Sequence, residues 1–163
     1  YLNLGTVSLG ALVIGVFEST IARVVALAVF LPIVPGQGGM GGVQTLTLIV
    51  RSMALGGVPA RRGLQLVARE FFLGLTQGLL LGLAVDLVAY LWKGNIMLGL
   101  ILALAMVGNM AVAGLTGSGV PLLLRWMRVD PAVSSAVFIT TVTDVIGLFL
   151  FLGLATLLIN WLL

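Results

Sequence analysis

One acidic residue lies in the middle of a long apolar segment near the end of the sequence. Asp144 stands in "AVFITTVTDVIGLFLFLGLATLL", which begins at Ala136 and contains no other charge. A carboxylate at the centre of a membrane helix costs about 2.5 to 3.5 kcal/mol on insertion scales, so it is a functional candidate by default. Thr140 and Ala136 precede Asp144 by four and eight residues, which places all three on one helical face.

The segment offers Asp144 no basic neighbour. Since it contains no Lys, Arg or His, a cation is the natural partner of the carboxylate. The alternative is that Asp144 pairs with a Ser, Thr or Gln on a neighbouring helix, or stays protonated. The functional bias of intramembrane acids favours the cation.

Composition places these residues in lipid. The 163 residues are 61% hydrophobic and only 8% charged, whereas a soluble domain has about a quarter of its residues charged. The sequence contains no Cys and no His, which excludes thiolate and imidazole metal sites, disulfides and His-based catalysis. No base is present to activate the hydroxyls near Asp144, so we expect no enzyme.

Long uncharged runs predict an all-α membrane protein with five transmembrane helices per subunit. The first run has neither a basic region before it nor a clear cleavage site after it, so we interpret it as a retained helix. The expected spans cover residues 2–17, 24–50, 71–92, 96–124 and 133–163.

The second span contains "PIVPGQGGMGG", with two prolines and five glycines in eleven residues. This composition predicts a broken helix. Unwound backbone at membrane depth is tolerated only where it is buried in protein or lines an aqueous cavity, where its carbonyls can face a cation or its water shell. The alternative is a re-entrant turn that merely caps the helix.

Basic residues predict the orientation of the spans. Six lie in two loops on one side: Arg51, Arg61, Arg62, Arg69, Arg125 and Arg128. The opposite side has only Arg23 and Lys93. The positive-inside rule puts the Arg-rich loops and the N-terminus in the cytoplasm, and the C-terminus outside. Trp92, Trp126 and Trp161 fall at span ends, as interfacial tryptophans do.

The other acids lie nearer to span ends. Glu18 either forms an ion pair with Arg23 or attracts cations to the pore entrance. Glu70 is placed to interact with the positive end of the helix dipole, and Asp130 to act as an N-cap. Asp86 either faces the outer headgroups or lines the outer pore. In the same third span, glycines at positions 74, 78 and 82 share one face, which favours tight helix packing.

Four blocks make the chain resemble the transmembrane domain of the MgtE magnesium channel family. They are "FESTIARVVALAVFLPIV", "GQGGMGGVQTLTLIVR", "VDPAV" and "TTVTDVIGLFLFLGLATLLI", in the family's order and spacing. The resemblance covers essentially all of residues 1–163 and implies one transmembrane cation-channel domain. It also implies a homodimer with five helices per subunit, whose pore at the subunit interface is lined mainly by the second and fifth helices.

The resemblance assigns the pore carboxylate to Asp144. It implies that this residue holds a largely hydrated Mg²⁺ through its water shell, and that Gly36, Gly39, Ala136 and Thr140 add backbone or small polar contacts. Mg²⁺ keeps several waters, so one carboxylate per subunit suits it. Two Asp144 side chains would form a site of formal charge −2. Mn²⁺ or another divalent ion is an alternative cargo.

The chain departs from the family pattern at three places. Met40 replaces an Asn, Val43 replaces a Thr or Asn, and Val137 replaces a Pro. We expect the loss of the two polar groups at Met40 and Val43 to bear on ion selectivity more than on the fold. Typical members also carry a cytoplasmic helical domain and a regulatory CBS pair, which this chain lacks. The start at Tyr1 without Met favours a chain trimmed to the pore domain over a natural short member.

We therefore expect a Mg²⁺ channel in a bacterial inner or plasma membrane. The lipid bilayer, a divalent metal ion and a second copy are the expected partners, and nucleic acid is not. A carrier that exchanges a divalent cation for Na⁺ or H⁺ is the main alternative, and a non-conducting structural subunit is another.

Overall fold

The computed structural model describes residues 2–56, 63–130 and 135–162, and every regular element in these ranges is a helix. This confirms the all-α prediction. In chain order the helices are α1 (Leu2–Val16), α2 (Glu18–Arg23), α3 (Ala26–Phe30), α4 (Ile33–Ala54), α5 (Gly63–Lys93), α6 (Ile96–Trp126), α7 (Ser135–Leu157) and α8 (Ile159–Leu162).

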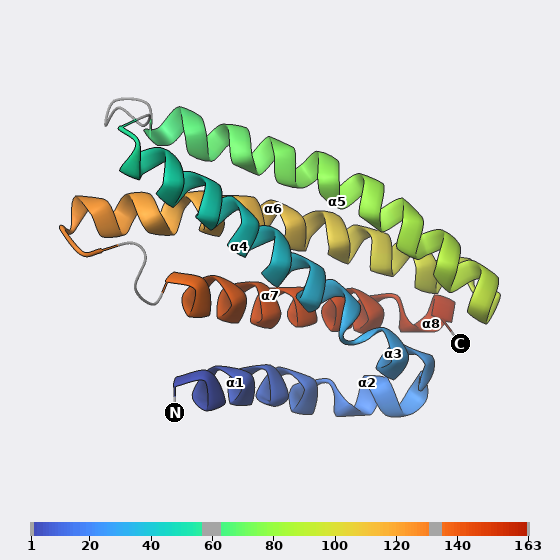
Figure 1. Cartoon of the computed structure of the whole chain (residues 1–163). Helices are drawn as coiled ribbons and strands as arrows, with labels where there is room; N and C mark the ends of the chain where they lie inside the picture. The colour runs from blue at the N-terminus through green and yellow to red at the C-terminus, as the bar shows by residue number, and fades with distance from the viewer. Residues whose placement is uncertain (1, 57–62, 131–134, 163) are drawn as a thin grey trace.

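The long helices lie side by side, with α4 crossing the others obliquely (Figure 1). The helix α6 lies at the centre and packs on α4, α5 and α7, while α1 packs along α7. Four helical segments of the described part are long and apolar enough to cross a membrane: Ala26–Ala54, Gly63–Lys93, Ile96–Trp126 and Ala136–Leu157. The chain is thus an integral membrane protein.

The first expected span is shorter than predicted. Its apolar helical part covers Leu4–Val16, and a turn at Phe17 separates α1 from α2. A contact between the Thr20 and Thr156 hydroxyl oxygens, 2.8 Å apart, ties α2 to α7. The pair α1–α2 therefore runs alongside α7, but α1 alone does not reach the length of a full span.

The second span is interrupted earlier than predicted. The helix α3 ends before a turn at Leu31 and Pro32, and α4 then runs unbroken to Ala54. The prediction of an unwound glycine-rich segment is wrong, because all five glycines lie inside α4. Pro35 is tolerated in the first turn of α4, where backbone N–H groups have no helical acceptor. The first regular bond follows at once, from the Gly36 N–H to the Pro32 carbonyl at 3.1 Å.

Close helix packing explains why this glycine-rich helix persists. A Cβ added at Gly38 would collide with Asn109 of α6, and one at Gly42 would collide with Ile139 of α7. Glycine costs about 1 kcal/mol relative to alanine in a helix. In lipid, an unwound segment would leave several backbone groups unsatisfied, which costs more, and the missing side chains let the neighbouring helices approach.

Basic side chains gather at one end of the bundle. Arg51 and Arg125 lie in the last turns of α4 and α6, at the end where α5 and α7 begin (Figure 1). Arg23 and Lys93 close α2 and α5 at the other end. For these four residues the structure shows the separation that the sequence predicts, whereas Arg61 and Arg62 lie outside the described residues. That the Arg-rich end faces the cytoplasm stays a prediction.

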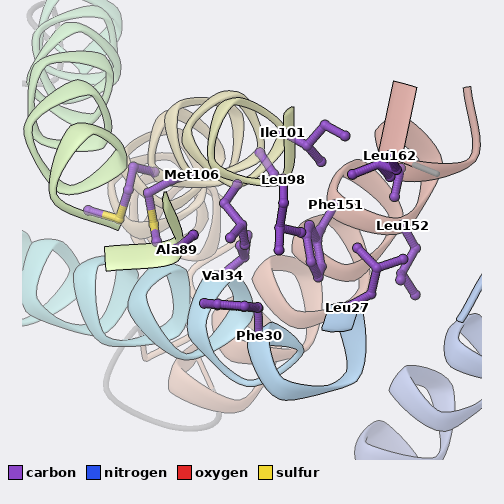
Figure 2. Packing of buried hydrophobic residues seen from close by; sticks show 14 residues of the cluster. Leu27, Phe30, Val34, Ala89, Leu98, Ile101, Met106, Phe151, Leu152 and Leu162 are labelled. Carbon is purple, nitrogen blue, oxygen red and sulfur yellow. The ribbon is translucent and has the colours of Figure 1, made fainter. Parts of the chain in front are cut away.

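The apolar core fills the end of the bundle away from these arginines. Phe30, Val34 and Phe151 are completely buried there, together with Leu98 and Ile101 of α6. Figure 2 shows side chains of this cluster meeting between α3, α4, α6 and α7. Beyond this core, three buried polar side chains lie farther along α6 and α7 toward the basic end: Asn109, Ser118 and Thr143.

The predicted glycine face of α5 packs on α6, which confirms the expectation from spacing. A Cβ at Gly78 would lie 2.7 Å from the Val107 Cα, and one at Gly82 would lie 2.9 Å from the Ala103 carbonyl oxygen. At Gly74 the added atom would collide with the Met110 carbonyl. These contacts are with backbone, which cannot rotate aside.

We expect Gly78→Leu to lower the free energy of unfolding by about 1–3 kcal/mol, the usual cost of overpacking. The leucine would push α5 away from α6. Thermal unfolding in detergent measures the effect, and Gly15→Leu is the control, since nothing lies within 4 Å of a Cβ there. Equal unfolding temperatures for the two variants would contradict this packing.

Candidate ion site

The helix α7 presents a polar face near the middle of the bundle. Thr143 is completely buried, whereas Asp144 and Thr140 are partly exposed. Within the described residues, no basic side chain makes an ion pair with Asp144. The carboxylate therefore lies at membrane depth without a compensating charge from the described part of this chain, which is the arrangement that calls for a cation.

The threonine hydroxyls beside Asp144 donate to their own helix. Thr140 Oγ1 lies 3.1 Å from both the Ala136 and the Val137 carbonyl oxygens, and Thr143 Oγ1 donates to the Ile139 carbonyl at 2.9 Å. A hydroxyl has one hydrogen to donate and two lone pairs. With its hydrogen used in the helix, Thr140 can offer only lone pairs outward, which suits a cation or the hydrogens of its water shell.

Gly39 of α4 lies directly opposite this face. A Cβ added at Gly39 would be 3.8 Å from Asp144 Oδ1, 3.7 Å from Thr143 Oγ1 and 3.6 Å from Thr140 Cγ2. The fold thus brings together three of the five predicted site residues, Gly39, Thr140 and Asp144. Because Gly39 has no side chain, α4 comes close to α7 here, and the space left beside the carboxylate would hold about one methyl group.

A cavity of about 380 Å³ opens beside Asp144 between α1, α4 and α7. Gly36 lines it together with Asp144, Pro35, Leu31 and Thr6. Gly36 is exposed, and nothing lies within 4 Å of a Cβ added there. Asp144 is the only charged residue among the described residues that line this cavity, so its carboxylate determines what the space attracts.

Ala136 does not join this group. Its side chain is exposed two helical turns before Asp144. Of the five predicted site residues only Gly36 and Asp144 line the cavity, while Gly39, Thr140 and Ala136 do not. Ala136 contributes its carbonyl to the Thr140 hydroxyl. Residues 131–134, which precede α7, lie outside the described part of the chain.

Gly36 and Gly39 do not supply the free backbone carbonyls that the sequence predicted for the ion. Gly36 and Gly39 lie in regular helix, so their carbonyls take part in the α4 ladder. Pro35, however, has no N–H to donate to the carbonyl of Leu31 four residues earlier. Leu31 lines the same cavity as Asp144. The sequence signal for this carbonyl is Pro35 itself, because a proline leaves the carbonyl four residues before it without a helical donor.

Asp86 lies away from α7. Its carboxylate contacts Gly99 in the first turn of α6, so closely that a Cβ at Gly99 would collide with it. The positive end of a helix dipole stabilises a carboxylate there. Since α5 packs on α6, this contact gives the partly buried acid a structural role at the start of α6.

The remaining acids differ partly from expectation. Glu70 lies well inside α5, which begins at Gly63, so its predicted role at the helix start is wrong. Glu18 begins α2 and is exposed, and within the described residues it makes no ion pair with Arg23. The predicted cap at Asp130 depends on the four residues that follow, which lie outside the described ranges.

The described residues contain no group of three or more His, Cys, Asp or Glu that could hold a bare metal ion. One carboxylate, hydroxyl lone pairs and a carbonyl form a weak set of ligands for a dehydrated ion. They suit an ion that keeps its own water, since Mg²⁺ prefers oxygen ligands and dehydrates reluctantly.

Comparison with known protein families agrees with this chemistry. Residues 31–154, more than half of the chain, match MgtE, described as a divalent cation transporter. The chain belongs to the MgtE family. The match begins at Leu31 and includes α4 and Asp144.

Three curated MgtE relatives align with most of this chain. They are magnesium transporters MgtE from Bacillus subtilis (31% identity over 88% of this chain), Enterococcus faecalis (32% over 99%) and Thermus thermophilus (36% over 88%). The aligned regions make up 32%, 35% and 32% of those relatives. The chain thus spans about a third of the length of the MgtE proteins that it matches.

Proposed function

We propose that this chain forms the ion-translocating part of a Mg²⁺ transporter, with the Asp144 carboxylate as its principal ion-binding group. The observation that carries the proposal is the position of Asp144: partly exposed in mid-helix, opposite Gly39, and beside a cavity without any other charged lining among the described residues. The three relatives named as magnesium transporters support Mg²⁺ as the cargo.

The size of the cavity suits a hydrated ion. Mg²⁺ binds six oxygens in an octahedron, and six waters occupy about 180 Å³ at about 30 Å³ each. The cavity of about 380 Å³ has room for such an ion. We propose that Asp144 and Thr140 accept hydrogen bonds from this water shell, and that the Leu31 carbonyl, beside Gly36, adds a further acceptor.

We further propose that a second copy of the chain completes the site. One carboxylate neutralises only half of a divalent cation, and two Asp144 side chains would balance it. The polar side chains of Gln37 and Gln44 are exposed on α4 at membrane depth. Lipid does not satisfy such groups, so a partner subunit or water must cover them. This placement favours a pore between two copies.

Purified protein in liposomes tests the proposal. We expect external Mg²⁺ to raise the signal of an enclosed Mg²⁺-sensitive dye. Chemical cross-linking in the same liposomes should give a dimer. Liposomes that take up no more Mg²⁺ than protein-free liposomes would contradict the proposed function.

A second measurement separates a channel from a coupled carrier. In a channel, Mg²⁺ flux needs no gradient of Na⁺ or H⁺ and rises with the membrane potential. We expect this behaviour, because the described helices offer Asp144 as the single charged group beside the cavity and no second carboxylate there for a coupling ion. Flux that stops when the Na⁺ or H⁺ gradient is removed would instead identify the carrier.

A further inference from the structure

A buried amide lies between the two helices that carry the ion site. Asn109 of α6 is completely buried, and its Nδ2 donates a hydrogen bond of 2.8 Å to the Val34 carbonyl of α4. Its Oδ1 has no hydrogen-bond partner among the described residues. A polar group of this kind is costly in an apolar interior, so its presence needs an explanation.

Glycines on both neighbouring helices make room for this amide. A Cβ at Gly147 of α7 would lie 2.6 Å from Asn109 Nδ2 and 3.0 Å from its Cγ. At Gly38 of α4 the added Cβ would collide with the same amide. The amide thus fills the gap between α4 and α7, and neither helix has space to move closer while it is there.

The two glycines adjoin the ion-site residues. Gly38 precedes Gly39, and Gly147 lies three residues, about one helical turn, after Asp144. The separation of α4 and α7 at Asn109 therefore determines how far Gly39 lies from the carboxylate. A change of this separation would alter the space in front of Asp144 without touching the carboxylate itself.

We propose that Asn109 is a positioning residue that sets the distance between α4 and α7, and thereby the width of the gap between Gly39 and Asp144. This proposal rests on the proposed function, because the position of the Asp144 carboxylate relative to α4 matters only if the carboxylate binds an ion. Asn109 itself is buried and does not contact the ion. It acts through its bond to the Val34 carbonyl and through its volume between Gly38 and Gly147.

A double-mutant cycle in the full-length protein tests this role. The variants are Gly147→Ala, Asn109→Ala and the double variant, and the readout is the Mg²⁺ concentration that gives half-maximal flux into liposomes. We expect Gly147→Ala to raise this concentration about tenfold, equivalent to about 1.4 kcal/mol. The double variant should return to within about threefold of Asn109→Ala, because the shorter side chain makes room for the new methyl group.

Gly153→Ala is the matched control on the same helix, since nothing lies within 4 Å of a Cβ there. It should leave the half-maximal concentration unchanged. If Gly147→Ala does not fold, recovery of a folded double variant supports the same contact, and Asn109→Ala alone must still shift the half-maximal concentration. Equal values for Asn109→Ala and the parent, or effects that simply add, would overturn the proposal.

The outcome is distinguishable from failure of the proposed function. A parent protein that transports Mg²⁺ and loses transport with Asp144→Asn, but shows no coupling between Asn109 and Gly147, would remove only the positioning role. A parent protein that transports no Mg²⁺ would remove both.

Discussion

Asp144→Asn is expected to reduce Mg²⁺ flux at least about a hundredfold while the protein still folds. A divalent ion about 5 Å from one carboxylate interacts with it by roughly 7 kcal/mol at an effective dielectric constant of about 20. Loss of only about 2.7 kcal/mol of this attraction is a hundredfold change. The amide keeps the size of the carboxylate, so the packing around Gly39 and Thr140 should persist. Dye-based flux into liposomes measures the effect.

Asp86→Asn is the matched control for this experiment. It removes the same charge from another helix of the bundle, at a carboxylate that contacts Gly99 rather than the ion site. We expect its flux to stay within about twofold of the parent, since its helix-dipole interaction is worth only about 0.3–1 kcal/mol of stability. If Asp144→Asn transports Mg²⁺ as well as Asp86→Asn does, the carboxylate is not part of the pathway.

The second large effect is expected at Gly39. An alanine there would make ordinary contacts of 3.6–3.8 Å with Thr140, Thr143 and Asp144, so the helices need not move. A valine adds two further methyl groups for which these contacts leave no room, so it would push the Asp144 carboxylate away from its position beside the cavity. Because the carboxylate can bind a hydrated ion only where it faces the cavity, we expect flux to fall several-fold in Gly39→Ala and about a hundredfold in Gly39→Val.

The glycine, alanine and valine variants at position 39 differ in side-chain size and not in polarity. Gly153→Val on α7 is the control, because nothing lies within 4 Å of a Cβ at that position. Flux should decrease in the order glycine, alanine, valine at position 39, with similar unfolding temperatures for glycine and alanine. If Gly39→Val conducts as well as Gly153→Val does, the position of the carboxylate relative to α4 does not control the flux.

Much of the fold was predictable because it depends on local patterns. Long apolar runs predicted the helices, and the spacing of Gly78 and Gly82 predicted the face of α5 that packs on α6. The grouping of Asp144 with Thr140 followed from helical periodicity. Each of these features is determined within one segment, so a single sequence was sufficient.

The features that the sequence did not predict depend on contacts between segments. Helix propensity alone favoured an unwound stretch after Pro32, but packing against α6 and α7 keeps α4 helical through it. Likewise, a lone Asn109 in an apolar span gave no sign of lying between Gly38 and Gly147. Only the arrangement of α4, α6 and α7 brings these three residues together, since they come from three separate helices.

A structure of the full-length protein soaked in Mn²⁺, which scatters anomalously and can replace Mg²⁺, tests the central claim most directly. We predict an anomalous peak between the Asp144 side chains of two copies, at a distance that leaves room for bound water, and no such peak in Asp144→Asn. A peak elsewhere in the membrane part, with Asp144 facing lipid or another side chain, would contradict the account.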